Sequence, residues 1–433
     1  MKSQKIFFQI IPSYIIILMP ALLISGPFLS DLGVSIVTIL FLINSKKNNL
    51  FRYYNNIYFK FFIVFCLIII VSSLLSDNIL ISLKNSIFYF RFGIFSLCFW
   101  YLLEKNDKIL YFLFYSIIIC FLSLIIDGYI QFFFGKNLFG IEIQGIRVSS
   151  FFGSELVLGS YLSRFFPILF GLFIFIDQKL KIKNKKFLFI LTIIFILAEG
   201  LILLSGERIA LFFMNLSAIY IILMINNYKK YRFWTYLASL LLIFGLIIFI
   251  PSTQNRIVNQ TFNDFTNNSS FLSDAKKNSD KIYIFSKAHN DMYITGLKIF
   301  DKNKLFGVGP RQYRNVCRDY QVSKFSCQTH PHNTYIELLS EAGIFAFLLV
   351  LGLFLLIIIS SLRQFFNNIF NNKKKYFNDF EICLLSAIII SLWPLSPTGS
   401  FFHNWMSIVY YFPVGIFLWQ RYLNTKSDKS FKK

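Results

Sequence analysis

The sequence predicts an all-α integral membrane protein with about twelve transmembrane helices and one long outer loop that contains short helices. Its 433 residues are 56% hydrophobic and only 15% charged, a composition that excludes an ordinary water-soluble enzyme. Apolar runs of about twenty residues recur along the chain, with short clusters of Lys and Arg between them. Because the net charge of +22 is spread over these clusters, it indicates cytoplasmic loops beside a lipid bilayer and no nucleic-acid partner.

The predicted spans divide the chain into four parts. Residues 1–251 hold nine spans, 252–333 form a large loop, 334–420 hold three more spans, and 421–433 are a basic tail. The first run follows Lys2 and Lys5, but its length and the missing small-residue cleavage site favour a retained span over a signal peptide. The twelve spans are expected near residues 6–25, 29–44, 57–75, 85–103, 109–127, 155–176, 187–204, 209–226, 234–251, 334–360, 379–395 and 404–420.

Basic residues predict the orientation of these spans. More than half of the 43 Lys and Arg residues fall in the two tails and in alternate loops on one side of the predicted bundle. Short basic loops face the cytoplasm, whereas the charge of a long loop says little about orientation. We therefore expect both termini in the cytoplasm and the loop 252–333 on the outer, periplasmic side.

The six cysteines fall into two groups. Four lie in or beside predicted spans and are read as apolar packing residues: Cys66, Cys98, Cys120 and Cys383. Cys317 and Cys327 lie ten positions apart in the outer loop, where an oxidising compartment would allow a disulfide. A metal site is the weaker alternative because no C-x-x-C pair is present. We expect neither a metal nor another cofactor.

Arginines inside membrane spans are functional candidates because an unpaired guanidinium costs several kcal/mol in lipid. Arg91, Arg164 and Arg208 occupy such positions, and structural pairing or snorkelling is the alternative for each. Arg208 stands out because Ser205 and Gly206 interrupt the apolar run just before it and place it at an outer mouth.

Two outer segments add further basic candidates. The connection 127–155 is rich in Gly and aromatic residues and carries Arg147, a combination that suits sugar rings and phosphates as well as an ordinary interfacial belt. In the large loop, Gly307, Gly309 and Pro310 predict a sharp turn. That turn presents Arg311 and Arg314 together, either to grip a pyrophosphate or as a solvated basic turn. Before it, a helix is expected near 283–300, with His289 on it and with inward-facing Ile284, Ala288, Met292 and Ile299.

Two of the four histidines stand together where the outer loop enters the tenth span. His330 and His332 flank Pro331, and Asn333 follows. An imidazole at this boundary can accept a proton near neutral pH, which the activation of an acceptor hydroxyl requires. A zinc site is disfavoured because no third ligand follows at a suitable spacing.

Taken in order, these segments resemble the bacterial O-antigen ligase and O-antigen polymerase superfamily. The hallmark of that family is His-Asn (or Ser, Gln), nine residues and then Gly, and His332-Asn333 is followed at that spacing by Gly343. The family often has Gly, Thr or Tyr three positions after that Gly, and Ala346 stands there in this chain. Four more patches are similar to family elements: RVSSFFGSE at 147–155, with Ser150 in place of a Gly, SGERIA at 205–210, FGVGPRQYR at 306–314 and WPLSPTGSFF at 393–402.

The resemblance implies a GT-C-like glycosyltransferase of the bacterial inner membrane with its active site on the periplasmic side. It implies an inverting, metal-independent transfer of a glycan from undecaprenyl diphosphate to the lipid A-core of lipopolysaccharide. His332 would be the base, Arg147 and Arg208 would hold the diphosphate, and Arg311, Arg314, His330 and Asn333 would be further substrate contacts. Polymerisation of lipid-linked repeats and transfer to protein hydroxyls remain open alternatives. A lipid-linked glycan flippase or transporter, the reading from a different class, would be expected to show internal repeats, which are not evident in the sequence.

Overall fold

The computed structural model describes residues 2–181, 185–266, 285–370 and 376–430, and within these ranges the chain is helical with no β-strand. Helix breakers in the sequence delimit several elements. Gly26 adopts a φ of 114° and Pro27 follows as the first residue of α3, while Gly135, with a φ of 78°, ends α7. The α-helices are α1 (Lys2–Lys5), α2 (Ile11–Ile24), α3 (Pro27–Asn48), α4 (Ile57–Leu74), α5 (Ile79–Ile87), α6 (Phe90–Lys105), α7 (Ile109–Phe134), α8 (Leu158–Leu180), α9 (Lys185–Leu204), α10 (Arg208–Met224), α11 (Lys229–Phe249), α12 (Pro251–Gln254), α13 (Gln260–Thr266), α14 (Lys287–Lys302), α15 (Tyr313–Tyr320), α16 (Thr334–Glu337), α17 (Gly343–Ile369), α18 (Asp379–Ser391) and α19 (Asn404–Ser430).

The membrane prediction is confirmed, since nine helical segments within the described residues are long and apolar enough to cross a bilayer. The other three predicted spans are also helical, but they fall outside this group. They are α10, with 17 residues, α18, with 13 residues, and α19, whose C-terminal turns are polar. A 13-residue helix is only about 20 Å long. Because every residue of α18 after its first is buried among other helices, it does not need to match the thickness of the bilayer.

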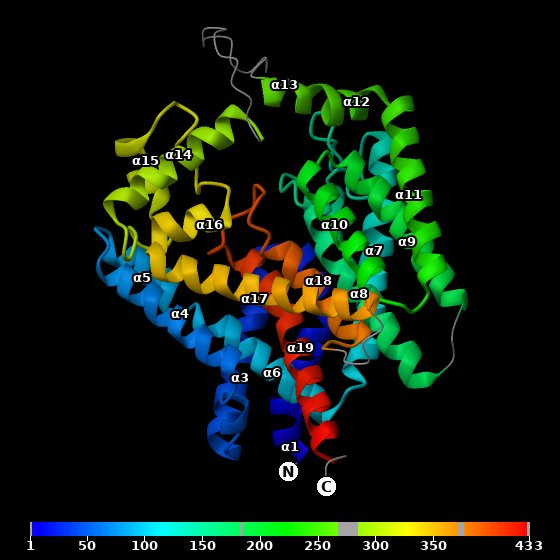
Figure 1. The fold of residues 1–433 in the computed structure, drawn as a ribbon, viewed down its shortest axis with the longest axis vertical. Helices are drawn as coiled ribbons and strands as arrows, with labels where there is room; N and C mark the ends of the chain where they lie inside the picture. Colours follow the sequence, from blue (N-terminus) through cyan, green and yellow to red (C-terminus); the bar gives the residue numbers. More distant parts are fainter. Residues whose placement is uncertain (1, 182–184, 267–284, 371–375, 431–433) are drawn as a thin grey trace.

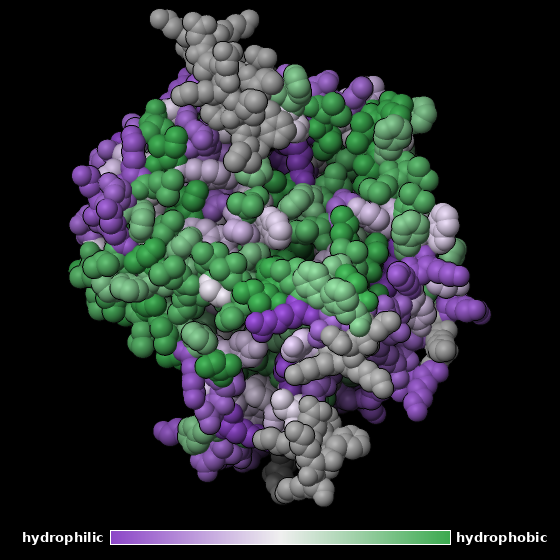
Figure 2. All heavy atoms as spheres, in the orientation of Figure 1, coloured by the Kyte–Doolittle hydropathy of each residue, from purple (hydrophilic) through white to green (hydrophobic). Residues whose placement is uncertain are grey.

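The bundle has buried central helices and lipid-exposed peripheral ones. α18 packs between α8 and α19, and α6 packs along α19, whereas α11 contacts mainly α9 at the periphery. Figure 2 shows hydrophobic side chains spread over the middle of one face and hydrophilic ones gathered near its lower end. These exposed apolar side chains are those expected for a multi-pass membrane protein.

The two ends of the chain lie at the same end of the bundle, and the loop helices α12 to α15 lie at the opposite end (Figure 1). The predicted loop helix near 283–300 is α14, which begins after its N-cap Ser286. Met292 and Ile299 are buried on it and Ala288 is partly buried, while Ile284 lies outside the described residues.

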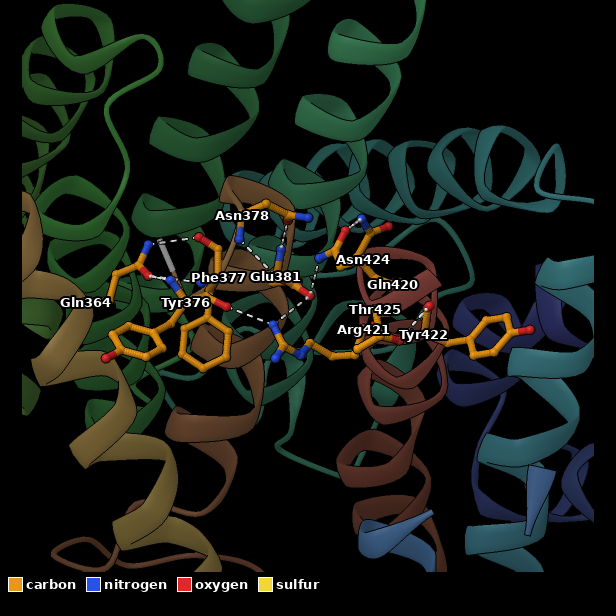
Figure 3. A network of polar contacts seen from close by, with 10 residues as sticks. All are labelled: Gln364, Tyr376, Phe377, Asn378, Glu381, Gln420, Arg421, Tyr422, Asn424 and Thr425. Carbon is orange, nitrogen blue, oxygen red and sulfur yellow. Dashed lines mark hydrogen bonds and ion pairs between the residues drawn. The ribbon is translucent and has the colours of Figure 1, made fainter. Parts of the chain in front are cut away.

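At the end near the termini, a polar network joins α17, α18 and α19 (Figure 3). Asn378 and Glu381 form a reciprocal capping box that starts α18. Arg421 on α19 donates to the carbonyl of Tyr376 at 2.7 Å and lies 3.6 Å from Glu381, and Asn424 donates to Glu381 at 3.0 Å. The network anchors the last helices far from the predicted site.

Candidate active site

The helix that follows the histidines starts with an unusual turn. After α16, residues Leu338–Ala342 form a π-helical segment before α17 begins. The wider turn leaves backbone carbonyls free to accept other donors. The carbonyls of Ser340 and Glu341 accept hydrogen bonds from the backbone of Val308 at 3.0 Å and Gly309 at 2.8 Å. The loop before α15 is thereby docked onto the start of the helix.

Two glycines permit this close approach of two backbones. Gly343 has φ 77° and ψ −174°, a conformation that is essentially restricted to glycine. A Cβ added there would lie 2.1 Å from the carbonyl oxygen of Leu305, and one added at Gly307 would lie 2.4 Å from the carbonyl carbon of Glu341. The glycine that ends the His-Asn-x9-Gly element is therefore explained by steric contact with the loop.

His330 is fixed by hydrogen bonds at both ring nitrogens. Its Nε2 lies 3.2 Å from the carbonyl oxygen of Thr398, and its Nδ1 lies 3.0 Å from the hydroxyl of Thr329. Because a carbonyl can only accept, Nε2 carries the proton and Nδ1 accepts from Thr329. Burial and the neighbouring His332 lower the pKa of His330 to about 3. We therefore interpret His330 as a neutral residue that positions its neighbour.

His332 lies beside it and is partly exposed. Its ring centroid is 4.1 Å from that of His330 and 5.9 Å from that of His289 on α14. Its φ of 52° is unusual for a non-glycine residue, and its carbonyl accepts from the backbone of Thr398 at 2.9 Å. Burial lowers the pKa of His332, partly offset by the backbone of Thr398. A neutral imidazole that is open to solvent can accept a proton.

Asn333 is fully used within the protein. Its side-chain oxygen caps α16 by accepting from the backbone of Tyr335 and Ile336, at 3.0 and 3.1 Å. Its amide nitrogen donates to the carbonyls of Pro394 at 2.9 Å and Ser396 at 3.2 Å. The predicted substrate contact of Asn333 is thus occupied by a cap and by the loop before α19, and the residue positions His332.

Three arginines gather around the turn between α9 and α10. Successive carbonyls of this turn bind two of them: Ser205 accepts from Arg147 Nε at 2.9 Å, and Gly206 from Arg256 Nε at 3.4 Å. Burial lowers the pKa of both Arg147 and Arg256, and the charge of Arg208 lowers each further. We call Arg147, Arg208 and Arg256 the α10 arginine cluster. Arg256 was not predicted from the sequence, because no local pattern marks it.

Arg208 is ion-paired across the site. Its guanidinium donates to the hydroxyl of Thr261 at 2.9 Å and to the carboxylate of Asp264 on α13 at 2.8 Å. The adjacent Glu207 does not pair with Arg208, since its carboxylate accepts from the backbone of Gly159 and Ser160 at the start of α8.

The connection that carries Arg147 is held by two buried polar residues at the end of α7. Gln131 accepts from the backbone of Ser149 and Ser150, and Asp127 accepts from the hydroxyl of Ser150 at 2.6 Å. Ser150 adopts a φ of 50°, a left-handed conformation that suits the glycine of the similar family element. The hydrogen bonds of Ser150 help to hold this strained backbone in place.

A second basic cluster includes Arg311 on the docked loop. Glu341 accepts from the backbone of Arg311 at 2.6 Å and Tyr313 at 2.8 Å, which holds the turn that presents Arg311 and Arg314. Burial and the charge of Arg314 lower the pKa of Arg311. Both guanidiniums also lower the pKa of His403, which precedes α19. We call Arg311, Arg314 and His403 the Arg311 cluster.

The histidines lie between the two clusters. Burial, His332 and Arg208 together lower the pKa of His289 to about 4. His289 is thus within electrostatic range of both His332 and the α10 arginine cluster. On the other side, Arg314 and His403 contribute to the lowered pKa of His330. Figure 1 shows the same arrangement, with α10 to α12 on one side of α16 and α5, α14 and α15 on the other.

The remaining candidates have structural partners. Arg91 donates to Asp31 at 2.7 and 3.0 Å, and the buried Arg164 donates to the carbonyl of Ser160 and lies over the ring of Phe213. Cys317 and Cys327 are joined by a disulfide, and Cys317 packs with Ile299 and Tyr313. The other four cysteines are free and buried. No group of three or more His, Cys, Asp or Glu suited to a metal ion occurs among the residues that the structure describes.

An apolar groove of about 540 Å³ runs between α4, α6, α17, α18 and α19. Phe401 and Leu392 line it, and both are tied to the helix that follows His332. The backbone of Phe401 donates to Glu337 at 2.8 Å, and the hydroxyl of Tyr335 donates to the carbonyl of Leu392 at 2.8 Å. Two residues that line the groove are thus joined to the helix that follows His332. Gly352 on α17 also lines the groove, and a Cβ added there would meet no atom within 4 Å.

Residues 191–351 match a family model described as O-antigen ligase. The matched stretch runs from α9 into α17 and contains Arg208, Arg256, the Arg311 turn and both His330 and His332. No curated protein matches the chain. The family match confirms the resemblance that the sequence motifs indicate.

Proposed function

We propose that this chain belongs to the O-antigen ligase superfamily and transfers a glycan from undecaprenyl diphosphate to the lipid A-core of lipopolysaccharide. The observation that carries the proposal is the position of His332: its partly exposed ring lies 5.9 Å from that of His289, whose pKa is lowered in turn by the charge of Arg208 in the α10 arginine cluster. A base near clustered guanidiniums is the arrangement that displacement of a diphosphate needs.

In this reaction His332 removes the proton from the acceptor hydroxyl, and the oxygen attacks the anomeric carbon of the donor. The bond between that carbon and the diphosphate oxygen breaks, and undecaprenyl diphosphate leaves with the electron pair. Negative charge grows on the leaving group, and the α10 arginine cluster stabilises it with charge-assisted hydrogen bonds. Attack from the opposite face inverts the configuration at the anomeric carbon.

The apolar groove supports a lipid-linked donor. The bond that breaks joins the sugar directly to the lipid diphosphate, so the polyprenyl chain must begin beside the histidines. The groove between α4 and α17 has a mostly apolar lining that includes Phe401, whose backbone donates to Glu337 in the helix that follows His332. Burying a hydrocarbon chain there would contribute roughly 0.8 kcal/mol per CH₂ group.

The proposed location is the bacterial inner membrane with both termini in the cytoplasm and the site on the periplasmic face. Two observations support this orientation. The basic loops favour the cytoplasm for the end of the bundle that holds the termini, and α12 to α15 lie at the other end. The disulfide between Cys317 and Cys327 also fits an oxidising compartment.

The test is a transfer assay with the purified protein in detergent, undecaprenyl-diphosphate-linked polymer and lipid A-core. The wild type is compared with His332→Ala, and thermal unfolding checks that the variant is folded. A capped lipid A-core product that His332→Ala fails to form supports the proposal. Lengthened lipid-linked repeats would identify a polymerase instead, and the absence of both products would direct attention to protein acceptors.

A further inference from the structure

The two guanidiniums of the Arg311 cluster have no direct carboxylate partner, although the charges of Glu341 and Glu337 raise the pKa of Arg311 from a distance. Among the described residues, neither Arg311 nor Arg314 forms an ion pair with a carboxylate side chain. The two nearby buried carboxylates are already used: Glu341 accepts from the backbone of Arg311 and Tyr313, and Glu337 accepts from the hydroxyl of Ser400 and the backbone of Phe401.

The groups in this cluster repel one another. The pKa of His403 is lowered by burial, then by Arg311 and, more weakly, by Arg314. Asp31 and Glu155 act in the opposite direction, but Asp31 is already paired with Arg91. His403 is therefore neutral near pH 7, and the remaining repulsion is between Arg311 and Arg314, which an anion bound between them would offset.

Arg311 is held for binding rather than for packing. Its Nε atom is buried and has no hydrogen-bond partner, which is unfavourable for a charged group. Its backbone adopts a φ of 63°, a strained value for an arginine. An unsatisfied donor and a strained backbone at one residue point to a ligand that completes the site.

The position of the cluster identifies the substrate that brings this anion. Arg314 is on α15, which lies on the other side of α16 from α10, the helix that begins with Arg208 (Figure 1). The charges of Arg314 and His403 also help to lower the pKa of His330, the neighbour of the proposed base. The donor diphosphate is already met by the three guanidiniums of the α10 arginine cluster. The anion at the Arg311 cluster therefore belongs to the acceptor.

We propose that Arg311, Arg314 and His403 form an acceptor subsite that binds a phosphate group of the acceptor glycolipid. This inference rests on the proposed glycosyl transfer. The two guanidiniums can each offer paired N–H donors to phosphate oxygens. The subsite would hold the acceptor so that its hydroxyl faces His332, while the α10 arginine cluster holds the donor.

The test combines one substitution with one change in the acceptor. Initial rates are measured for the wild type, Arg311→Gln and Arg318→Gln, with lipid A-core before and after enzymatic removal of its phosphates. Arg318 lies exposed on the same helix as Arg314 and serves as the matched control. Hydrogen bonds to charged groups predict that Arg311→Gln raises the acceptor KM about ten- to hundredfold and leaves the donor KM unchanged. Removing the phosphates should have a similar effect on the wild type and little further effect on Arg311→Gln.

The inference is overturned if phosphate removal affects Arg311→Gln as strongly as the wild type, or if Arg311→Gln raises the donor KM instead. Arg314→Gln, at an exposed position, repeats the test should Arg311→Gln fail to fold. Equilibrium binding of the phosphorylated acceptor to wild type and Arg311→Gln separates this inference from the proposed function. Phosphate-dependent binding that Arg311→Gln abolishes supports the subsite even when no product forms, and binding without phosphate dependence refutes it.

Discussion

Replacing Gly343 with Ala should detach the loop that carries Arg311. The residue has φ 77° and ψ −174°, where only glycine is comfortable. The new Cβ would lie 2.1 Å from the carbonyl oxygen and 2.4 Å from the carbonyl carbon of Leu305. These atoms belong to the backbone, so no side-chain rotation can relieve the clash and the loop itself must move.

The expected loss follows from the contacts at this junction. The strained backbone alone costs about 1–3 kcal/mol. Moving the loop also weakens three backbone hydrogen bonds between residues 304–309 and 340–344, each worth about 1 kcal/mol. We therefore expect Gly343→Ala to lower the free energy of unfolding by about 2–6 kcal/mol.

Gly352→Ala is the matched control on the same helix. A Cβ at Gly352 meets no atom within 4 Å, and alanine is favoured over glycine in a helix by about 0.5–1 kcal/mol. Thermal unfolding in detergent can be followed with a thiol-reactive dye, because the four free cysteines are buried. Gly343→Ala should unfold well below the wild type and Gly352→Ala at or slightly above it. Equal unfolding temperatures for the two variants would refute the steric argument.

Three further predictions concern the site. The pKa of His332 is lowered from 6.5, so its neutral form persists below that pH, and a pH–rate profile should show the transfer rate falling only in more acidic buffer. His332→Ala should lower the transfer rate about 10²–10⁴-fold. Asp264→Asn removes the ion pair of Arg208 and should reduce the donor KM several-fold in steady-state kinetics, whereas an unchanged or higher KM would contradict competition between Asp264 and the diphosphate. Gly352→Leu fills the groove and should raise the donor KM. Gly245→Leu on α11 should leave the donor KM unchanged, although a Cβ there also meets no atom within 4 Å. Equal effects of both substitutions on the donor KM would argue against the groove as a lipid site.

Much of the fold could be predicted because long apolar runs are a local signal. The predicted spans near 6–25 and 57–75, for example, correspond to Ile6–Ile24 and Ile57–Leu74. The span near 379–395 shows the limit of this reasoning. Its helix, α18, is shorter than a bilayer is thick and is buried by its neighbours, and burial by other helices cannot be read from hydropathy.

For the site, sequence patterns identified residues but not their partners. Arg208 and His332 stand in recognisable local motifs, so they could be named from spacing alone. Arg147 and Arg256 are more than a hundred residues apart in the sequence. They meet only because they bind consecutive carbonyls of the α9–α10 turn. The pairing of Arg208 with Asp264 and the cap role of Asn333 also depend on tertiary contacts that no local pattern encodes.

The hydrogen bonds between the histidine segment and Thr398 bear on how the protein is made. The backbone nitrogen of Thr398 binds His332, its carbonyl binds His330, and Asn333 binds Pro394 and Ser396. All of these partners lie between α18 and α19, so they leave the ribosome well after the histidines. A nascent chain that ends after α17 contains His330, His332 and every arginine of the two clusters, but it lacks the residues at 394–398 that hold the histidine segment. The proposed transfer activity would therefore begin only after α18 and the segment that follows it have been synthesised.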